Sequence, residues 1–115
     1  MGVIEEPSHP AETLEDPEQL KEAGNDFFKK GEWDDALECY TEAIKKTKDD
    51  CEKQKAIYYK NRAACSLKME RFDDAVDDCN KSLGYIPNDP KALFRRCQAY
   101  EALGKVDSAY ADAKV

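Results

Sequence analysis

The chain has 115 residues and a net charge of −7, with 37% charged and 41% hydrophobic residues. This length suits one domain with a modest core, and the low content of glycine and proline, 5 of each, favours amphipathic helices over a turn-rich β fold. The negative charge argues against nucleic acid as a partner, because phosphates require a basic face, and no apolar run approaches the length of a membrane span.

Residues 1–16 are acidic, rich in proline and without helical periodicity, so we expect a flexible tail that buries little apolar surface. From residue 17 onward, apolar and small residues recur at intervals of three and four, which is typical of amphipathic helices. The N-terminus lacks the regions of a signal peptide, and the five cysteines form no Cys-x-x-Cys pair. Reduced thiols in a cytoplasmic protein fit this composition best.

A short motif occurs three times, as GEWDDA from Gly31, ERFDDA from Glu70 and GKVDSA from Gly104. The final alanines of the three copies are 39 and 34 residues apart, and about 34 residues is the length of a tetratricopeptide repeat (TPR). The excess in the first interval is assigned to the polar stretch 47–55, which is expected to lengthen a helix or the connecting loop.

The recurring apolar and small residues resemble those of the TPR family, and they predict an all-α TPR superhelix of three helix-turn-helix repeats, at about 17–50, 56–89 and 90–115. Small residues are expected where paired helices touch: Gly24, Ala63 and Cys97 in the first helices, and Ala36, Ala75 and Ala109 in the second. Because few residues remain before Val115, the third repeat is predicted to be truncated and the chain to be part of a longer protein.

The pattern predicts six helices. We expect them at 17–30, 33–46, 53–69, 72–85, 90–103 and from 106 onward. Pro17 and Pro90 suit helix starts, and Asn88 and Asp89 offer capping oxygens.

The first helices of the repeats are expected to line a concave groove for an extended peptide. Lys21 and Asn25 lie four residues apart on one helix face, as do Lys91 and Arg95. Asn61 and Arg95 are 34 residues apart and so occupy equivalent positions on adjacent helices. Cations that flank amides suit an anionic peptide end, and we predict that the groove binds a C-terminal carboxylate.

Three segments carry a closer resemblance, since LKEAGN, YKNRAAC and KALFRR are similar to the carboxylate-clamp TPR domains of chaperone cofactors. In that family the clamp binds the acidic Glu-Glu-Val-Asp C-terminus of Hsp90 or Hsp70. The resemblance implies that the five clamp positions are filled here by Lys21, Asn25, Asn61, Lys91 and Arg95. It further implies that Phe28 and Ala64 help to line the groove around the apolar side chain of the peptide.

Two segments, YKNRAACSLK and DPKALFRRCQAYEALGK, are most similar to the N-terminal domain of the UCS-type myosin chaperones. This resemblance implies that a myosin-binding region follows in the full protein, and that the module recruits Hsp90 to a client held elsewhere. It leaves the choice between Hsp90 and Hsp70 open.

Two other function classes stay open beside the co-chaperone adaptor. One is a structural TPR scaffold that binds a different protein segment or a neighbouring domain, and the other is an enzyme that carries this module elsewhere in its chain. The residues themselves predict no catalysis, no metal and no cofactor, because the single histidine, His9, lies in the expected tail and no phosphate-binding glycine loop is present.

Several conspicuous side chains receive a structural interpretation. Arg62 and Arg96 are expected to pair with the acidic second helices as ordinary salt bridges. The aromatic residues at repeat positions are assigned to the core and the turns, without a ligand role; they are Trp33, Phe72, Phe27, Tyr40, Tyr59 and Tyr100.

Overall fold

The computed structural model describes residues 9–105, and every regular element in that range is an α-helix. The helices are α1 (Pro10–Thr13), α2 (Pro17–Lys29), α3 (Trp33–Lys46), α4 (Glu52–Lys68), α5 (Phe72–Tyr85) and α6 (Pro90–Ala102). The five helices predicted between 17 and 103 are therefore confirmed to within one residue at each end. The helix expected from 106 onward lies outside the described residues.

Two of the helix starts are set by proline and aspartate. Pro17 is the first residue of α2, and the Asp16 carboxylate accepts a hydrogen bond from the Glu18 N–H at 3.0 Å. Pro90 begins α6 in the same way, and the Asp89 carboxylate accepts from the Lys91 N–H at 3.1 Å. The predicted cap of α6 is confirmed for Asp89. Both aspartates satisfy backbone donors that have no partner within the helix.

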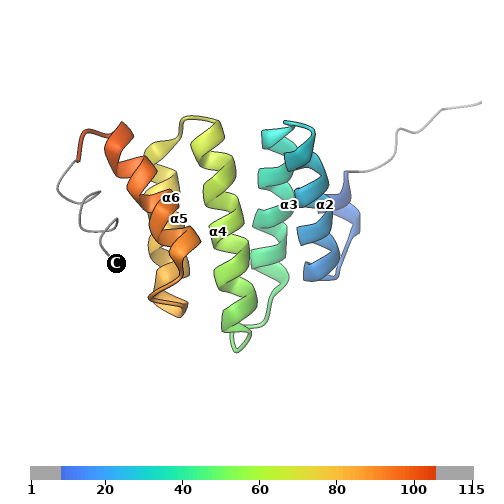
Figure 1. Cartoon of the computed structure of the whole chain (residues 1–115). Helices are drawn as coiled ribbons and strands as arrows, with labels where there is room; N and C mark the ends of the chain where they lie inside the picture. Colours follow the sequence, from blue (N-terminus) through green and yellow to red (C-terminus); the bar gives the residue numbers. More distant parts are fainter. Residues whose placement is uncertain (1–8, 106–115) are drawn as a thin grey trace, which may run out of the picture.

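The helices pack as neighbours in chain order, with α2 against α3, α4 in the centre, and α5 and α6 at the other end (Figure 1). A glycine permits the closest of these approaches. A Cβ atom placed on Gly24 would lie 2.6 Å from the Tyr40 ring of α3, so only glycine fits between the two helices at this point. The small residues predicted at the other helix contacts are also buried within the described range; they are Ala36, Ala63, Ala75 and Cys97.

The first repeat is joined to the second through Tyr58 of α4. Its ring is fully buried with Leu20 of α2 and Ala43 of α3, and its hydroxyl donates a hydrogen bond to Glu18 Oε1 at 3.0 Å. The polar stretch 47–55 forms the loop between α3 and α4 and the first turn of α4. The extra residues thus lengthen both the loop and the helix, and they leave the packing of Tyr58 undisturbed.

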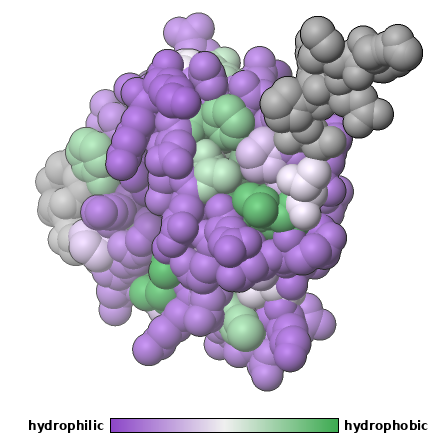
Figure 2. Space-filling view, turned by 90° about the vertical axis from the view of Figure 1, so that its right-hand side faces the viewer, coloured by the Kyte–Doolittle hydropathy of each residue, from purple (hydrophilic) through white to green (hydrophobic). Residues whose placement is uncertain are grey.

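Residues 9–14 depart from the flexible tail that the composition suggests. Ala11 of α1 is buried, and Leu14 packs against the cluster around Leu20. The His9 ring stacks on Phe27 with ring centres 5.2 Å apart. Figure 2 shows this end of the molecule, where hydrophilic side chains cover most of the face and hydrophobic ones form separate spots. A few apolar contacts and one stacked ring hold this helical turn against α2 and α3. The amino-acid composition of the segment does not predict these contacts.

The predicted salt bridge of Arg62 is confirmed, and it is more deeply placed than an ordinary surface pair. Arg62 of α4 binds Asp78 of α5 through two hydrogen bonds of 2.8 Å, and only 4% of Asp78 is exposed. The third guanidinium nitrogen lies 3.3 Å from Thr41 of α3. The side chain therefore links three helices with its charge neutralised, which is the arrangement that a buried ion requires. Arg96 donates a hydrogen bond to Asn80 of α5 at 2.8 Å.

The turns between paired helices generate one prediction. Gly31 and Gly104 have φ angles of 76° and 78°, and Glu70 at the equivalent turn has a φ of 58°. An L side chain is disfavoured in this left-handed region, whereas glycine is not. We expect Glu70→Gly to raise the free energy of unfolding, measured by urea denaturation, by about 0.5–1 kcal/mol. This is a net value, because glycine relieves the strained turn but also gives the unfolded chain more conformational entropy. Gly31→Ala should have the opposite sign, and a loss of stability in Glu70→Gly would contradict this account of the turn.

Candidate functional site

The groove-lining residues predicted from the sequence lie on α2, α4 and α6, here called the A helices (Figure 1). On α2, Lys21, Asn25 and Phe28 follow one another at intervals of four and three, so they share a face. Asn61 and Ala64 do the same on α4. Each A helix thus contributes one strip of side chains, and the packing of the helices places the strips next to one another.

A groove of about 490 Å³ runs across the three A helices, and we call it the A-helix groove. It brings together three of the predicted residues, Phe28 of α2, Ala64 of α4 and Arg95 of α6. Five further side chains complete its lining: Leu67, Lys68, Phe72, Phe94 and Gln98. The groove is therefore an aromatic and aliphatic trough with cations along it, which suits an extended peptide that carries acidic and apolar side chains.

Arg95 is held at the centre of this arrangement. Its guanidinium donates to the Lys60 carbonyl of α4 at 3.4 Å, which fixes the side chain across the gap between α6 and α4. Burial raises the pKa of the Cys65 thiol to about 12, and the Arg95 charge opposes this rise. Burial likewise raises the pKa of Tyr40, again against the charge of Arg95. The Arg95 charge therefore acts on Tyr40 of α3 and on Cys65 of α4.

Asn25 has its amide oriented by Tyr40. The Tyr40 hydroxyl donates to Asn25 Oδ1 at 2.5 Å, and because burial raises the pKa of Tyr40, this hydroxyl keeps its proton at physiological pH. With the oxygen occupied in this way, the Asn25 NH₂ group is left to donate. An amide held as a donor is suited to a carboxylate or to a backbone carbonyl of a peptide.

Lys21 and Lys91 stand at the two ends of the strips. Lys21 is paired with Glu18 in the preceding turn of α2, at 2.8 Å, and the hydrogen bond from Lys21 is the main reason that the pKa of Glu18 lies below its usual value. Lys91 is exposed and lines a second hollow of about 260 Å³ together with Arg95 and Phe94. Asn61 is half-buried on α4, next to the residue whose carbonyl accepts from Arg95. The A-helix groove itself is not lined by Lys21, Asn25, Asn61 or Lys91.

Two aromatic residues of the groove are not anticipated in the sequence. Phe72 is assigned to turn packing by its repeat position, yet it lines the groove. Phe94 is 63% exposed and is the single exposed large hydrophobic residue in the described range. Phe94 follows Lys91, a predicted binding residue, by three positions on α6, and this spacing is the signal that could have identified it.

The α4 and α6 strips are held in register by an ion pair. Lys60 Nζ of α4 lies 2.6 Å from Asp89 Oδ2, and the two side chains are 16% and 11% exposed. Burial raises the pKa of Asp89, but the hydrogen bond and charge of Lys60, with the N–H groups of Lys91 and Ala92, outweigh burial and leave this pKa below its usual value. The pair joins the residue beside Asn61 to the cap of the helix that carries Lys91, so it positions two of the predicted binding strips.

Within 9–105 no group of three or more histidine, cysteine, aspartate or glutamate side chains is arranged to hold a metal ion. None of the helices described is long and apolar enough to traverse a lipid bilayer.

Comparison with known proteins gives the same picture of the fold. The sequence profile of the tetratricopeptide repeat family matches residues 17–50. The protein unc-45 homolog B of Xenopus laevis is 48% identical over 101 residues, which cover 88% of this chain and 11% of the frog protein. The chain thus spans about a ninth of the length of this relative.

Two solved structures resemble the chain closely. The myosin chaperone UNC-45 from C. elegans, in complex with an Hsp90 peptide, has a TM-score of 0.84 and 40% identity, over 88% of this chain and 11% of that one. The second TPR of Spaghetti (RPAP3), bound to the HSP90 peptide SRMEEVD, has a TM-score of 0.78 and 34% identity, over 85% of this chain and 81% of that one.

The ion pair between the strips yields a prediction. Asp89→Asn keeps a capping oxygen but removes the charge that faces Lys60, so we expect the free energy of unfolding at neutral pH to fall by about 2 kcal/mol. Because the pKa of Asp89 is lowered in the folded state, its stabilisation is complete above the unfolded pKa and is lost as the pH falls through the lower folded pKa.

Urea unfolding of the two proteins should therefore differ at neutral pH and converge in strong acid, below the usual carboxyl pKa of 3.8. Asp73→Asn, on an exposed aspartate at the start of α5, is the matched control and should change stability by less than about 0.5 kcal/mol. An equal loss in both variants would show that the Lys60 contact contributes nothing specific.

Proposed function

Because the chain belongs to the tetratricopeptide repeat family, whose members are protein-interaction modules and not enzymes, we propose that it is a co-chaperone adaptor module that binds the acidic C-terminal peptide of Hsp90. The observation that carries the proposal is the A-helix groove, in which Arg95 and the lining aromatics lie together. Independent support comes from two similar solved structures, both of which contain an Hsp90 peptide.

The proposed mechanism is capture of a terminal carboxylate by fixed donors. The Asn25 and Asn61 amides and the Lys21 ammonium group bind the carboxylates at the chain end, while Lys91 and Arg95 bind the acidic side chains before it. Phe28 and Ala64 contact the apolar side chain of the peptide, which lies between its acidic residues. Donors that are already oriented lose little conformational freedom on binding, which is the contribution of the Tyr40 contact to Asn25.

Lys21 must exchange its partner during binding, because Glu18 occupies it in the free protein. A peptide carboxylate replaces that contact at a partly exposed site, where an ion pair contributes only about 0–1 kcal/mol. Lys21 therefore adds more to the recognition of charge than to affinity. Arg95, which donates to a backbone carbonyl at a longer distance, is expected to contribute more.

The proposal extends to the partners and the setting of the module. Hsp70 is a second partner of the same groove, since its tail carries the same terminal chemistry. In a cytoplasmic protein with further domains, the module would bring the chaperone to a client held elsewhere, and the similarity to a myosin chaperone suggests myosin as that client.

Calorimetric titration with the peptide SRMEEVD tests the proposal directly. We expect micromolar affinity, about −8 kcal/mol at 1 μM, and a loss of tenfold or more when the peptide is amidated at its C-terminus or when Arg95 is replaced by alanine. Arg96→Ala is the matched control, because this neighbouring arginine bonds to Asn80 of α5 and does not line the groove.

The Arg95 and Arg96 variants must keep the helical circular dichroism of the parent for the comparison to hold. Equal affinity for the free and the amidated peptide would contradict carboxylate capture and would favour a structural scaffold that binds internal segments.

Tyr40→Phe provides a second test, on the orientation of Asn25. Loss of the hydroxyl leaves the Asn25 amide free to rotate, so peptide affinity should fall by about three- to tenfold, the effect of one hydrogen bond of about 0.5–1.5 kcal/mol. Tyr85→Phe removes the hydroxyl of a tyrosine on α5 that stacks on Tyr59 and does not line the groove, and it is the control. If the two variants bind the peptide equally well, Tyr40 does not position Asn25 for binding.

A further inference from the structure

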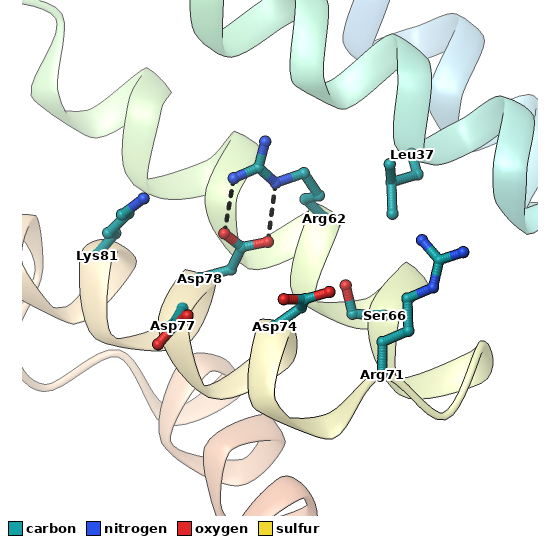
Figure 3. A pocket seen from close by; sticks show the side chains of 8 residues that line it. All are labelled: Leu37, Arg62, Ser66, Arg71, Asp74, Asp77, Asp78 and Lys81. Atoms are coloured by element: carbon teal, nitrogen blue, oxygen red, sulfur yellow. Dashed lines mark hydrogen bonds and ion pairs between the residues drawn. The ribbon is translucent and has the colours of Figure 1, made fainter.

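The ion pairs of the described residues differ in how easily they open. Arg62 and Asp78 share two hydrogen bonds of 2.8 Å on the wall of a hollow of about 280 Å³ over Ser66, and their side chains are 21% and 6% exposed (Figure 3). Lys21 and Glu18 are joined by a single contact of 2.8 Å, and their side chains are 24% and 49% exposed. The first pair is a fixed part of the fold, whereas the second is open to a ligand that approaches from the surface.

Glu18 is also held from a second side. Its Oε2 atom faces the Lys21 ammonium group, and its Oε1 atom accepts a hydrogen bond of 3.0 Å from the Tyr58 hydroxyl. The Tyr58 ring is fully buried on α4, so this hydroxyl is a fixed point. The Glu18 carboxylate therefore stays beside α4 when Lys21 moves, and the ammonium group leaves the carboxylate behind whenever it reaches another partner.

A carboxylate in the preceding turn of the same helix is a permanent competitor for Lys21. Because both groups belong to one chain, Glu18 meets the ammonium group at an effective concentration on the order of millimolar or higher, whatever the solution contains. A small anion that contacts Lys21 alone gains no more from that contact than it displaces. A peptide that other groups of the groove also hold is able to make the exchange.

The direction of the contact favours competition over assistance. Glu18 lies one turn before Lys21 on α2, and Asn25 lies one turn after it. The pair with Glu18 therefore draws the ammonium group away from the amide beside which it would bind the end of a peptide. An ammonium group has three hydrogens, so the other arrangement to be tested is one in which Lys21 binds Glu18 and the peptide together.

We propose that Glu18 is a specificity-determining residue, which competes with the ligand for Lys21 and so reserves this lysine for a peptide that is held at several other points of the groove. The inference rests on the proposed function, in which Lys21 binds a carboxylate at the end of the peptide. Glu18 lowers the affinity for that peptide by the contact that has to be broken. Because the Tyr58 hydroxyl keeps the carboxylate in place, Glu18 recaptures Lys21 when the peptide dissociates.

Glu18→Gln tests the proposal in the full 115-residue chain, because glutamine keeps an oxygen for the Tyr58 hydroxyl and removes only the charge. In calorimetric titration, this variant should bind SRMEEVD about two- to fivefold more tightly than the parent, as expected from the loss of one exposed ion pair. Glu22→Gln is the matched control. It removes the same charge from an exposed position on α2 and should change the affinity by less than about 1.5-fold at physiological ionic strength.

A double-mutant cycle shows whether Glu18 acts through Lys21. In the Lys21→Ala protein the competitor has no cation to hold, so the addition of Glu18→Gln should leave the affinity for SRMEEVD unchanged. A purely structural effect of Glu18→Gln would appear in both backgrounds. Acetate, compared with chloride at the same concentration, should shift the side-chain ¹⁵N resonance of Lys21 in Glu18→Gln and leave it in place in the parent.

Three results would overturn the proposal and leave the proposed function standing. They are weaker binding of SRMEEVD by Glu18→Gln, which would make Glu18 a positioning residue, equal affinities of the Glu18 and Glu22 variants, or the same gain in the Lys21→Ala background. A parent protein that does not bind SRMEEVD would contradict the proposed function itself and this inference with it.

Discussion

The contact between Gly24 and the Tyr40 ring is the constraint on which the first repeat and the groove depend. The absence of a side chain at Gly24 lets α3 approach α2 so closely that the Tyr40 ring lies against the helix backbone. That position also brings the Tyr40 hydroxyl to Asn25, one residue further along α2. A single small residue therefore sets both the distance between two helices and the orientation of the Asn25 amide, for which we propose a role in binding.

The chain is acidic overall, and its basic side chains fall into two groups: some are paired with carboxylates inside the fold, and others lie near the groove. Arg62 is bound by Asp78 and Lys60 by Asp89, and both pairs are largely shielded from water. These pairs position helices and are not available to a ligand. Arg95 and Lys91 stay close to the groove surface, so an acidic peptide meets local positive charge although the net charge is −7. Local charge, and not the total, decides which partner such a surface attracts.

The places where the repeats differ from one another are the informative ones. Glu70 stands at a turn where the other repeats have glycine, and it adopts a left-handed conformation at some cost. Ser66 stands where the other repeats have an aromatic ring, and it leaves a hollow. Repetition supplies the packing, and each departure from it either strains the chain or opens a space that the fold itself does not fill.

The sequence alone was enough to predict the helices, their pairing and the small residues at their contacts. The reason is that each repeat carries the same pattern of helix-forming and packing residues. It also pointed to Phe28, Ala64 and Arg95, which the structure brings to one groove. It did not identify Phe72 or Phe94 as lining residues, the ordered turn at His9, the partner of Asn25 or the hollow over Ser66. Those features depend on how side chains from different helices meet, and such contacts are set by tertiary packing and not by the spacing of residues along one helix.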